Sequence, residues 1–168
     1  MARAVRTYLE MTDPLDLTGD SAALPDVRVE RDTVCNPGEW RRLYTDVGRE
    51  YHWTDRLPWT DEDIARYLSD PAVELWILRE AGETAGYFEL RREPDRAVEI
   101  AYFGLLPAFI GRGLGKYLLT AAVKRAWDLG ATRVWVHTSS LDHTSALSNY
   151  LSRGFSIWKQ EVYDVDIC

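Results

Sequence analysis

Residues 109–120 read FIGRGLGKYLLT, so three glycines and two cations lead directly into an apolar segment. Leucine and alanine then recur at helical spacing as far as Leu129, and Gly130 predicts the end of that helix. The stretch follows a predicted strand at residues 97–105. A strand, a glycine-rich turn and a helix in this order predict a helix N-terminus with bare backbone amides, which is a typical anion site. The alternative is a tight connection that needs glycine for its backbone angles, and the spacing alone does not decide between the two.

The two common nucleotide-binding loops do not fit this stretch. A P-loop requires glycine where Ile110 stands, and serine or threonine where Tyr117 follows Lys116. The dinucleotide fingerprint requires its third glycine at the position of Lys116. The turn is therefore expected to hold a different ligand.

The elements around this stretch predict an α+β fold. Strands are expected at residues 4–12, 26–34, 73–80, 84–92, 97–105, 132–138 and 155–165. Helices are expected at residues 36–53, 61–68, 114–129 and 143–153, with Asn36 and Asp142 as candidate N-caps and Pro37 in the first turn of its helix. A meander followed by strand, helix, strand, helix and strand predicts a sheet of mixed direction.

The strand at residues 97–105 carries a candidate acid–base group. Regular alternation would place Val98, Ile100 and Tyr102 on one face, and Glu99, Ala101 and Phe103 on the other. The Glu99 carboxylate would then lie among apolar neighbours, which would raise its pKa. A solvated strand face, or an ion pair with Arg91, Arg92 or Arg96, is the alternative role for Glu99.

The bulk composition describes an ordinary globular protein. The chain has 168 residues, 46% hydrophobic and 28% charged, and residues 1–168 are expected to form a single domain. A formal charge of −7 argues against nucleic acid as a partner, because phosphate backbones need clustered cations. The same charge suits a cationic substrate, although solubility alone would explain it.

Targeting and metal signals are weak. Cys35 and Cys168 give no disulfide framework and are expected to be free thiols. The N-terminus does not read as a signal peptide, and no apolar run has the length of a membrane span, so a cytoplasmic protein without membrane association is expected. The three histidines lack the spacing of metal ligands, so no metal is expected.

Two motifs in the second half resemble those of the GNAT family, the acetyl-CoA-dependent N-acetyltransferases. In LLPAFIGRGLGKYLL, Gly113 and Gly115 match the glycines of the family's acetyl-CoA loop. HTSALSNYLSRGF resembles a second family motif, matched by Ala146, Tyr150, Gly154 and Phe155. The resemblance covers residues 72 to 158. It implies the GNAT fold, an α/β sandwich whose central sheet is mixed and mostly antiparallel, with helices on both faces.

The resemblance implies acetyl-CoA as the cosubstrate. The amides of residues 110–115 would wrap its pyrophosphate, and the edge of residues 103–105 would pair with the pantetheine amides. Ile110 replaces the family's usual Gln or Arg, and His143 stands where the family often has Asn. These departures would weaken cofactor binding and alter how the pantetheine arm is held. The implied cofactor-binding residues are Phe103, Gly104, Leu105, Ile110, Gly111, Arg112, Gly113, Leu114, Gly115, Lys116 and His143.

The resemblance also assigns roles in transfer to an amine. Tyr150 matches a tyrosine near the thioester sulfur and would protonate the leaving thiolate; a packing role is the alternative. Glu99 would accept the amine's proton, a task that water performs in many members. The backbone N–H of Leu105 would stabilise the oxyanion.

The segment YHWTDRLPWTDED, residues 51–63, lies where the family builds its acceptor wall. Trp53 and Trp59 could line a pocket, and Asp55 could attract an ammonium group, although the chain's seven tryptophans also have a core to fill. The expected function is transfer of acetyl to a primary amine of a small molecule or peptide. The alternative is an acyl-CoA-binding module of the same fold without catalysis. The resemblance also allows a homodimer.

Overall fold

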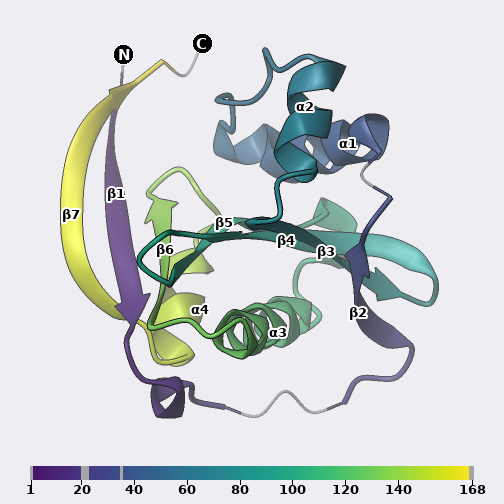
Figure 1. Ribbon diagram of the computed structural model, residues 1–168. Helices are drawn as coiled ribbons and strands as arrows, with labels where there is room; N and C mark the ends of the chain where they lie inside the picture. Colours follow the sequence, from purple (N-terminus) through teal and green to yellow (C-terminus); the bar gives the residue numbers. More distant parts are fainter. Residues whose placement is uncertain (1, 20–22, 35, 167–168) are drawn as a thin grey trace.

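A computed structural model describes residues 2–19, 23–34 and 36–166, which leaves Cys35 and Cys168, the expected free thiols, outside these ranges. The described strands form one seven-stranded sheet in the order β2-β3-β4-β5-β6-β1-β7 (Figure 1). β5 and β6 run parallel, and the other neighbouring pairs are antiparallel. The strands are β1 (Ala2–Met11), β2 (Val27–Asp32), β3 (Val73–Glu80), β4 (Glu83–Arg92), β5 (Ala97–Leu105), β6 (Arg133–Ser139) and β7 (Ser156–Val165).

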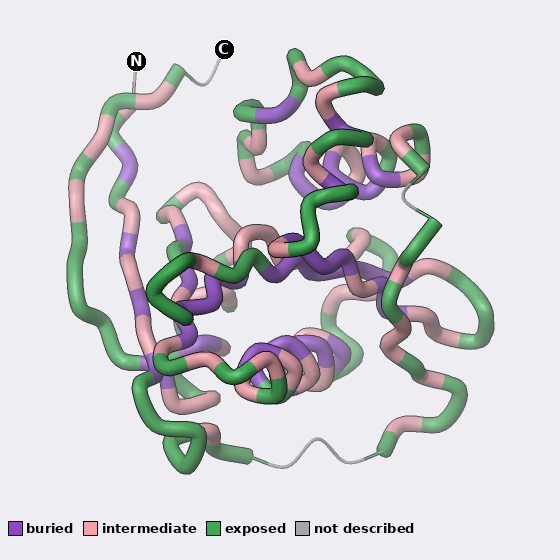
Figure 2. The backbone as a smooth tube through the Cα atoms, in the orientation of Figure 1, coloured by how far each residue is buried: buried purple, intermediate pink, exposed green. Residues whose placement is uncertain are grey.

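Helices cover both faces of the sheet. α1 (Pro37–Gly48) and α2 (Asp61–Leu68) lie on one face, and α3 (Leu114–Asp128) and α4 (Ala146–Ser152) lie on the other (Figure 1). Each face has its own apolar cluster, and the buried residues concentrate on the central strands and the inner side of α3 (Figure 2). The predicted mixed, mostly antiparallel sheet between helices is confirmed.

The predicted helix ends are right in part. The Asn36 side chain accepts hydrogen bonds from the N–H groups of Gly38 and Glu39, so the predicted cap of α1 is confirmed. α1 nevertheless ends at Gly48, and a short 3-10 turn follows. A side chain at Gly48 would lie 2.5 Å from Trp53, so glycine here lets the chain fold back on the helix.

The predicted cap at Asp142 is wrong. α4 begins at Ala146, and Asp142 lies in the loop before it. Its carboxylate instead accepts hydrogen bonds from the Thr138 hydroxyl at 2.6 Å and from the Ser139 N–H at 2.8 Å. Asp142 therefore fixes the end of β6 rather than the start of α4.

The predicted alternation along β5 is also wrong beyond Ile100. Glu89 of β4 pairs with Tyr102 while Leu90 pairs with Ile100, so Ala101 is an extra residue in β5. This bulge moves Tyr102 to the α1/α2 face, where it packs on that cluster, and moves Phe103 to the α3 face. The alternation of side chains along a strand, read from the sequence alone, does not reveal an inserted residue such as Ala101.

The sheet divides between β5 and β6. The two strands pair only from Ala97 to Glu99, opposite Arg133 to Trp135. β5 then continues to Leu105 and β6 to Ser139 without further pairing between them. One edge of β5 is therefore left unpaired along the second half of the strand.

Candidate active site

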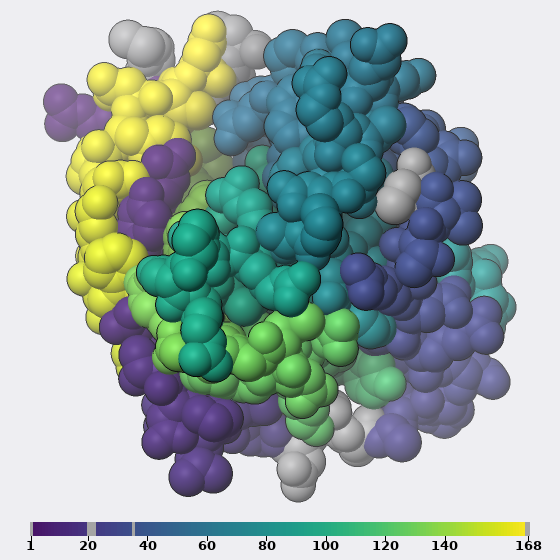
Figure 3. Space-filling view, in the orientation of Figure 1, coloured from purple at the N-terminus to yellow at the C-terminus, as the bar shows by residue number. Residues whose placement is uncertain are grey.

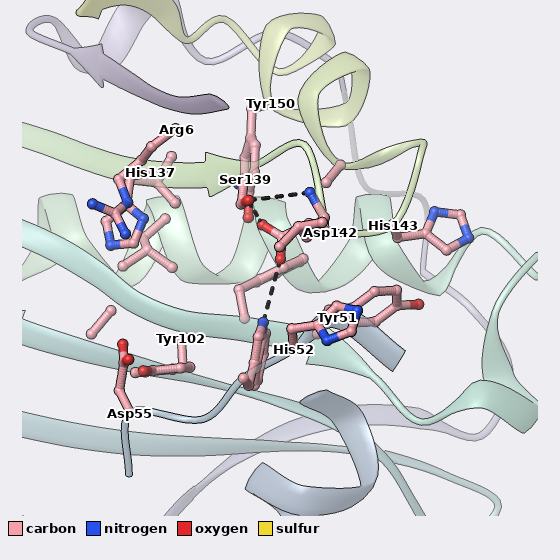
Figure 4. A pocket seen from close by; sticks show the side chains of 18 of the residues that line it. Arg6, Tyr51, His52, Asp55, Tyr102, His137, Ser139, Asp142, His143 and Tyr150 are labelled. Carbon is pink, nitrogen blue, oxygen red and sulfur yellow. Dashed lines mark hydrogen bonds between the residues drawn. The ribbon is translucent and has the colours of Figure 1, made fainter. Parts of the chain in front are cut away.

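A pocket of about 740 Å³ opens where β5 and β6 separate. Its walls come from the second half of β5, from β6 and α4, from residues 51–59 between α1 and α2, and from β1 and β7. Figure 3 shows the side of the molecule on which β1 and β7 stand apart from the α1/α2 layer. Tyr150 points into the pocket from α4, and Asp142 bonds to groups on both sides of it (Figure 4).

The pocket brings together most of the residues predicted for the site. Gly111, Arg112, Gly113, Leu114 and Lys116 do not line it and instead form the turn and first residues of α3 beside it. The predicted residues that line the pocket are Trp53, Asp55, Trp59, Glu99, Phe103, Gly104, Leu105, Ile110, Gly115, His143 and Tyr150.

The three glycines of the turn have different reasons to be glycine. Gly111 and Gly113 have φ values of +88° and +78°, a backbone conformation that favours glycine. Gly115 lies in the first turn of α3 without such a φ, and a Cβ there would meet no atom closer than 3.8 Å. The tight-connection alternative therefore accounts for Gly111 and Gly113 but not for Gly115, which lines the pocket.

The backbone around these glycines is rich in free donors. Within the described ranges, no hydrogen bond is donated by the N–H groups of residues 111–116, and Gly113 gives α3 no side-chain cap. Lys116 is exposed and makes no ion pair with a described residue. Arg112 pairs with Glu80 at 2.7 Å, so part of its charge is already neutralised. The arrangement offers several N–H groups and a helix dipole to an anion.

Tyr150 is a buried tyrosine in the wall of the pocket. It is 5% exposed and its ring meets Phe103 and Phe155 edge-on, with centroids 6.1 and 5.9 Å away. Its hydroxyl makes no hydrogen bond with another described residue. Burial, together with the negative charge of Asp142, raises the pKa of Tyr150, so the phenol keeps its proton at neutral pH.

Glu99 has features of both roles considered for it, the proton acceptor and the ion-pair partner of an arginine. It is 5% exposed, lines the pocket and bonds to Arg91 at 3.1 Å. Burial raises the pKa of Glu99, and the charge of Arg91 opposes that shift. Glu99 therefore forms an ion pair with Arg91, and the Glu99 carboxylate still faces the pocket.

A buried arginine, Arg56, lies in the wall of the pocket and was not identified from the sequence. Arg56 bonds to both oxygens of Glu89 at 2.8 and 2.9 Å and to the Tyr67 hydroxyl at 2.9 Å. Glu89 also accepts a hydrogen bond from Trp40. Four rings surround the guanidinium at 4.2–5.4 Å, those of Trp40, Trp59, Tyr67 and Tyr102. Trp59 therefore serves this cluster as well as the pocket wall.

Replacing Arg56 with leucine should destabilise the protein by about 3–5 kcal/mol, because the fully buried Glu89 carboxylate would lose its partner. Urea unfolding measures this loss. Arg112→Leu is the matched control, since it breaks a partly exposed pair with Glu80 and should cost less than about 1 kcal/mol. Equal losses for the two variants would mean that the buried Arg56–Glu89 pair contributes no more to the free energy of unfolding than the partly exposed Arg112–Glu80 pair.

Asp142 and Trp53 connect the two walls of the pocket. The Trp53 indole N–H donates to Asp142 at 3.3 Å, and its ring packs on Tyr102 with centroids 5.0 Å apart. Asp55, two residues on, is exposed, lines the pocket and makes no ion pair with a described residue. Trp53 and Asp55 thus both line the pocket, and their role toward an acceptor stays a prediction.

Other lining residues come from far away in the sequence, and no motif marks them. Arg6 of β1 and His137 of β6 face the pocket beside Ser139 (Figure 4). Asn149 lines the opposite end, where its Nδ2 donates to the Gly115 carbonyl at 3.4 Å. In the described ranges, no three His, Cys, Asp or Glu side chains gather as metal ligands, and no helix is long and apolar enough to cross a membrane.

Comparisons with known proteins agree with this architecture. A GCN5-related N-acetyltransferase from Kribbella flavida has a TM-score of 0.65 at 20% identity, over 91% of this chain and 54% of that one. A Bacillus subtilis acetyltransferase solved in complex with CoA has a TM-score of 0.60 at 24% identity, over 79% of this chain and 78% of that one. The divided mixed sheet thus has the acetyltransferase fold.

Sequence relatives point to the same family. An uncharacterized N-acetyltransferase of Mycobacterium tuberculosis is 36% identical over 94 residues, 56% of this chain and 60% of that protein. A mycothiol acetyltransferase of Pseudarthrobacter chlorophenolicus is 29% identical over 150 residues, 84% of this chain and 46% of that protein. The model of the acetyltransferase (GNAT) family matches residues 39–155, so the chain belongs to this family, as its motifs predicted. It spans about half the length of the curated relatives that it matches.

Proposed function

We propose that this protein transfers the acetyl group of acetyl-CoA to a primary amine. The observation that carries the proposal is Gly115, a pocket glycine that neither its backbone angles nor its packing requires, beside six backbone N–H groups that donate no hydrogen bond to a described residue. An acyl-CoA pyrophosphate needs several N–H donors and close backbone approach, and both are available here. The family and the CoA complex of the Bacillus subtilis neighbour support the choice of cosubstrate.

The cosubstrate would lie along the second half of β5. Amides 111–116 and Lys116 would hold the pyrophosphate, and Arg112 would add charge if it released Glu80. The free edge of Phe103, Gly104 and Leu105 would pair with the pantetheine amides. Ile110 would contact the arm through its apolar side chain. His143, whose Nδ1 accepts the Ser145 N–H, would replace the family's asparagine near the arm.

Three groups of the chain would then perform the transfer. Glu99 would accept a proton from the acceptor ammonium, directly or through water, because amide formation needs the nitrogen lone pair. The Leu105 N–H would stabilise the oxyanion that forms as nitrogen attacks the thioester carbon. As the carbon–sulfur bond breaks, the Tyr150 hydroxyl would give its proton to the sulfur, and the second proton lost by the attacking nitrogen would return to the phenolate, directly or through water. The products are an amide and free CoA.

The acceptor itself is proposed only as a class. Asp55 is a carboxylate without an ion pair in the described chain, so it suits the charge of a primary ammonium, and Trp53 and Trp59 supply flat walls for its body. Several relatives are named mycothiol acetyltransferases, which supports a small polar amine rather than a protein. The second candidate is an acyl-CoA-binding module without catalysis, favoured by the replacement of the usual Gln or Arg by Ile110. A homodimer and a cytoplasmic location stay predictions.

Glu99→Gln should lower kcat about 100-fold and change the pH profile. In the wild type, activity should fall as the pH drops through the raised pKa of Glu99, because the protonated carboxyl cannot accept a proton. The variant should lose this acidic limb, and its remaining rate should rise with pH as the amine deprotonates by itself. Steady-state kinetics across pH measure both effects. Glu83→Gln, an exposed change on β4 outside the pocket, is the control, and a wild-type profile in Glu99→Gln would remove Glu99 from the mechanism.

A further inference from the structure

The pocket has an end away from the glycine turn, and the acceptor should enter there. The end next to the glycine turn includes Gly115 and its hydrogen-bond partner Asn149. His137 and Asp55 both lie on the other side of Tyr150 from Tyr51 and His143 (Figure 4). This part of the pocket is therefore lined by Asp55, already proposed to attract the ammonium, and by His137, which the proposed transfer leaves unassigned.

Most charged groups at this end already have partners. Arg6 pairs with Glu161 at 2.9 Å and lies 4.4 Å from the Tyr163 ring. Glu99 pairs with Arg91. Asp55, by contrast, makes no ion pair and no side-chain hydrogen bond with a described residue, so its carboxylate is available to a ligand.

His137 also has unused capacity. It lies on β6 between Trp135 and Ser139, on the same face of the sheet as its β1 partner Tyr8. The rings of Tyr8 and Trp135 stand 5.6 and 6.4 Å from the imidazole and hold it in place. Neither ring nitrogen makes a hydrogen bond with a described residue, and the side chain lines the pocket.

We propose that His137 binds the acceptor, with its neutral imidazole accepting one N–H of the substrate's ammonium while Asp55 neutralises the charge. This rests on the proposed function and deepens it, because it names His137 as a second side chain that would hold the ammonium. His137 and Asp55 each need one N–H of the ammonium, and a third proton goes to Glu99. The acceptor therefore carries a primary ammonium, and secondary, tertiary and quaternary ammonium groups do not fit. His137 acts here as a specificity residue and does not take the proton, which goes to Glu99.

The environment of His137 favours the neutral form that this role needs. Although its side chain is accessible from the pocket, desolvation by the surrounding walls lowers the pKa of His137, and the charge of Arg6 lowers it further. Three carboxylates oppose the shift. The charged and titratable groups that face the ring are Arg6, Tyr8, Asp55, Asp142 and Glu161.

Binding should therefore depend on pH in a defined direction. Once protonated, His137 has only donors and a like charge, so it would repel an ammonium. Acceptor binding should weaken as the pH falls through the pKa of His137. By linkage, a bound primary ammonium must lower that pKa in return.

The test is an NMR titration of the histidine ring protons in the wild-type protein. The chain has three histidines, and the signal missing from His137→Gln identifies the one of interest. Saturating n-butylammonium should lower the pKa of His137 by about one pH unit, which corresponds to about tenfold tighter binding to the neutral form. Tetramethylammonium, which has no N–H donor, should leave it unchanged, and Asp55→Asn should weaken the effect of n-butylammonium.

Two results would overturn the proposal: an unchanged pKa with n-butylammonium, or an equal shift with tetramethylammonium. The first would show that the ammonium does not reach His137, and the second that only its charge acts there. Calorimetric titration with acetyl-CoA separates this outcome from failure of the proposed function, because His137→Gln should bind acetyl-CoA like the wild type. If acetyl-CoA binds normally and n-butylammonium does not change the pKa of His137, the proposed acetyl transfer would be retained and this acceptor site would be rejected.

Discussion

Replacing Gly115 with glutamate should remove acetyl-CoA binding, with a loss of affinity on the order of 100-fold or more, while the protein stays folded. The new side chain would start from a Cβ on α3 that lines the pocket and makes only ordinary contacts, at 3.8 Å from Asn149 and 3.9 Å from Leu105. A carboxylate there would face the pyrophosphate, and like charges brought together at an interface cost several kcal/mol. About 2.7 kcal/mol already corresponds to a 100-fold loss.

Gly115→Glu should keep or raise the thermal stability of the protein while it weakens acetyl-CoA binding. Glutamate is a better helix former than glycine, and a negative side chain in the first turn of a helix interacts favourably with the helix dipole, by about 0.3–1 kcal/mol. The melting temperature of Gly115→Glu should thus equal or exceed that of the wild type, and calorimetric titration measures binding separately. Ser148→Glu introduces the same charge at an exposed position of α4 outside the pocket and should bind normally. Wild-type affinity in Gly115→Glu would show that the bare turn does not hold the cosubstrate.

Tyr150→Phe should lower kcat by about 10²–10⁴-fold and leave the affinity for acetyl-CoA unchanged. The substitution removes one hydroxyl that makes no hydrogen bond with a described residue, and it keeps the ring that packs on Phe103 and Phe155. Because no described residue bonds to that hydroxyl, the effect should fall on proton transfer to the leaving sulfur. Single-turnover kinetics with acetyl-CoA measure it without a contribution from product release.

The control for this variant is Tyr117→Phe, which removes a phenol from α3 outside the pocket. It should have wild-type kinetics. If Tyr150→Phe also kept the wild-type rate, Tyr150 would be a packing residue, the alternative raised by its position on an amphipathic helix. A fall in acetyl-CoA affinity rather than in kcat would likewise assign it to binding.

Local chemistry made much of the fold predictable. Asn36 followed by Pro37 defines a helix start through hydrogen bonds within a few residues, and the structure has that cap. The glycine turn at residues 111–115 could be predicted for the same reason. Its backbone angles and its free amides depend on the residue at each position and not on distant contacts. The strands and their mixed arrangement follow from periodicity and element order.

The errors and omissions involve contacts between distant residues. The extra residue at Ala101 changes which side chains share a face, and only the register with β4 reveals it. Asp142 looked like a helix cap because its neighbours allow one, yet its partners are on β6 and at Trp53. Arg56 and Glu89 are 33 residues apart, and nothing near either predicts a buried pair. His137 becomes a pocket residue only through the separation of β6 from β5.

The most direct test of the central claim is an assay of acetyl transfer. The purified protein is mixed with acetyl-CoA and a panel of primary amines, free thiol is measured over time, and products are analysed by mass spectrometry. We expect release of CoA that requires both protein and amine, with one acetyl group gained by the amine. Acetyl-CoA that binds but releases thiol only at the uncatalysed rate with every amine would contradict the account and identify the protein as an acyl-CoA-binding module.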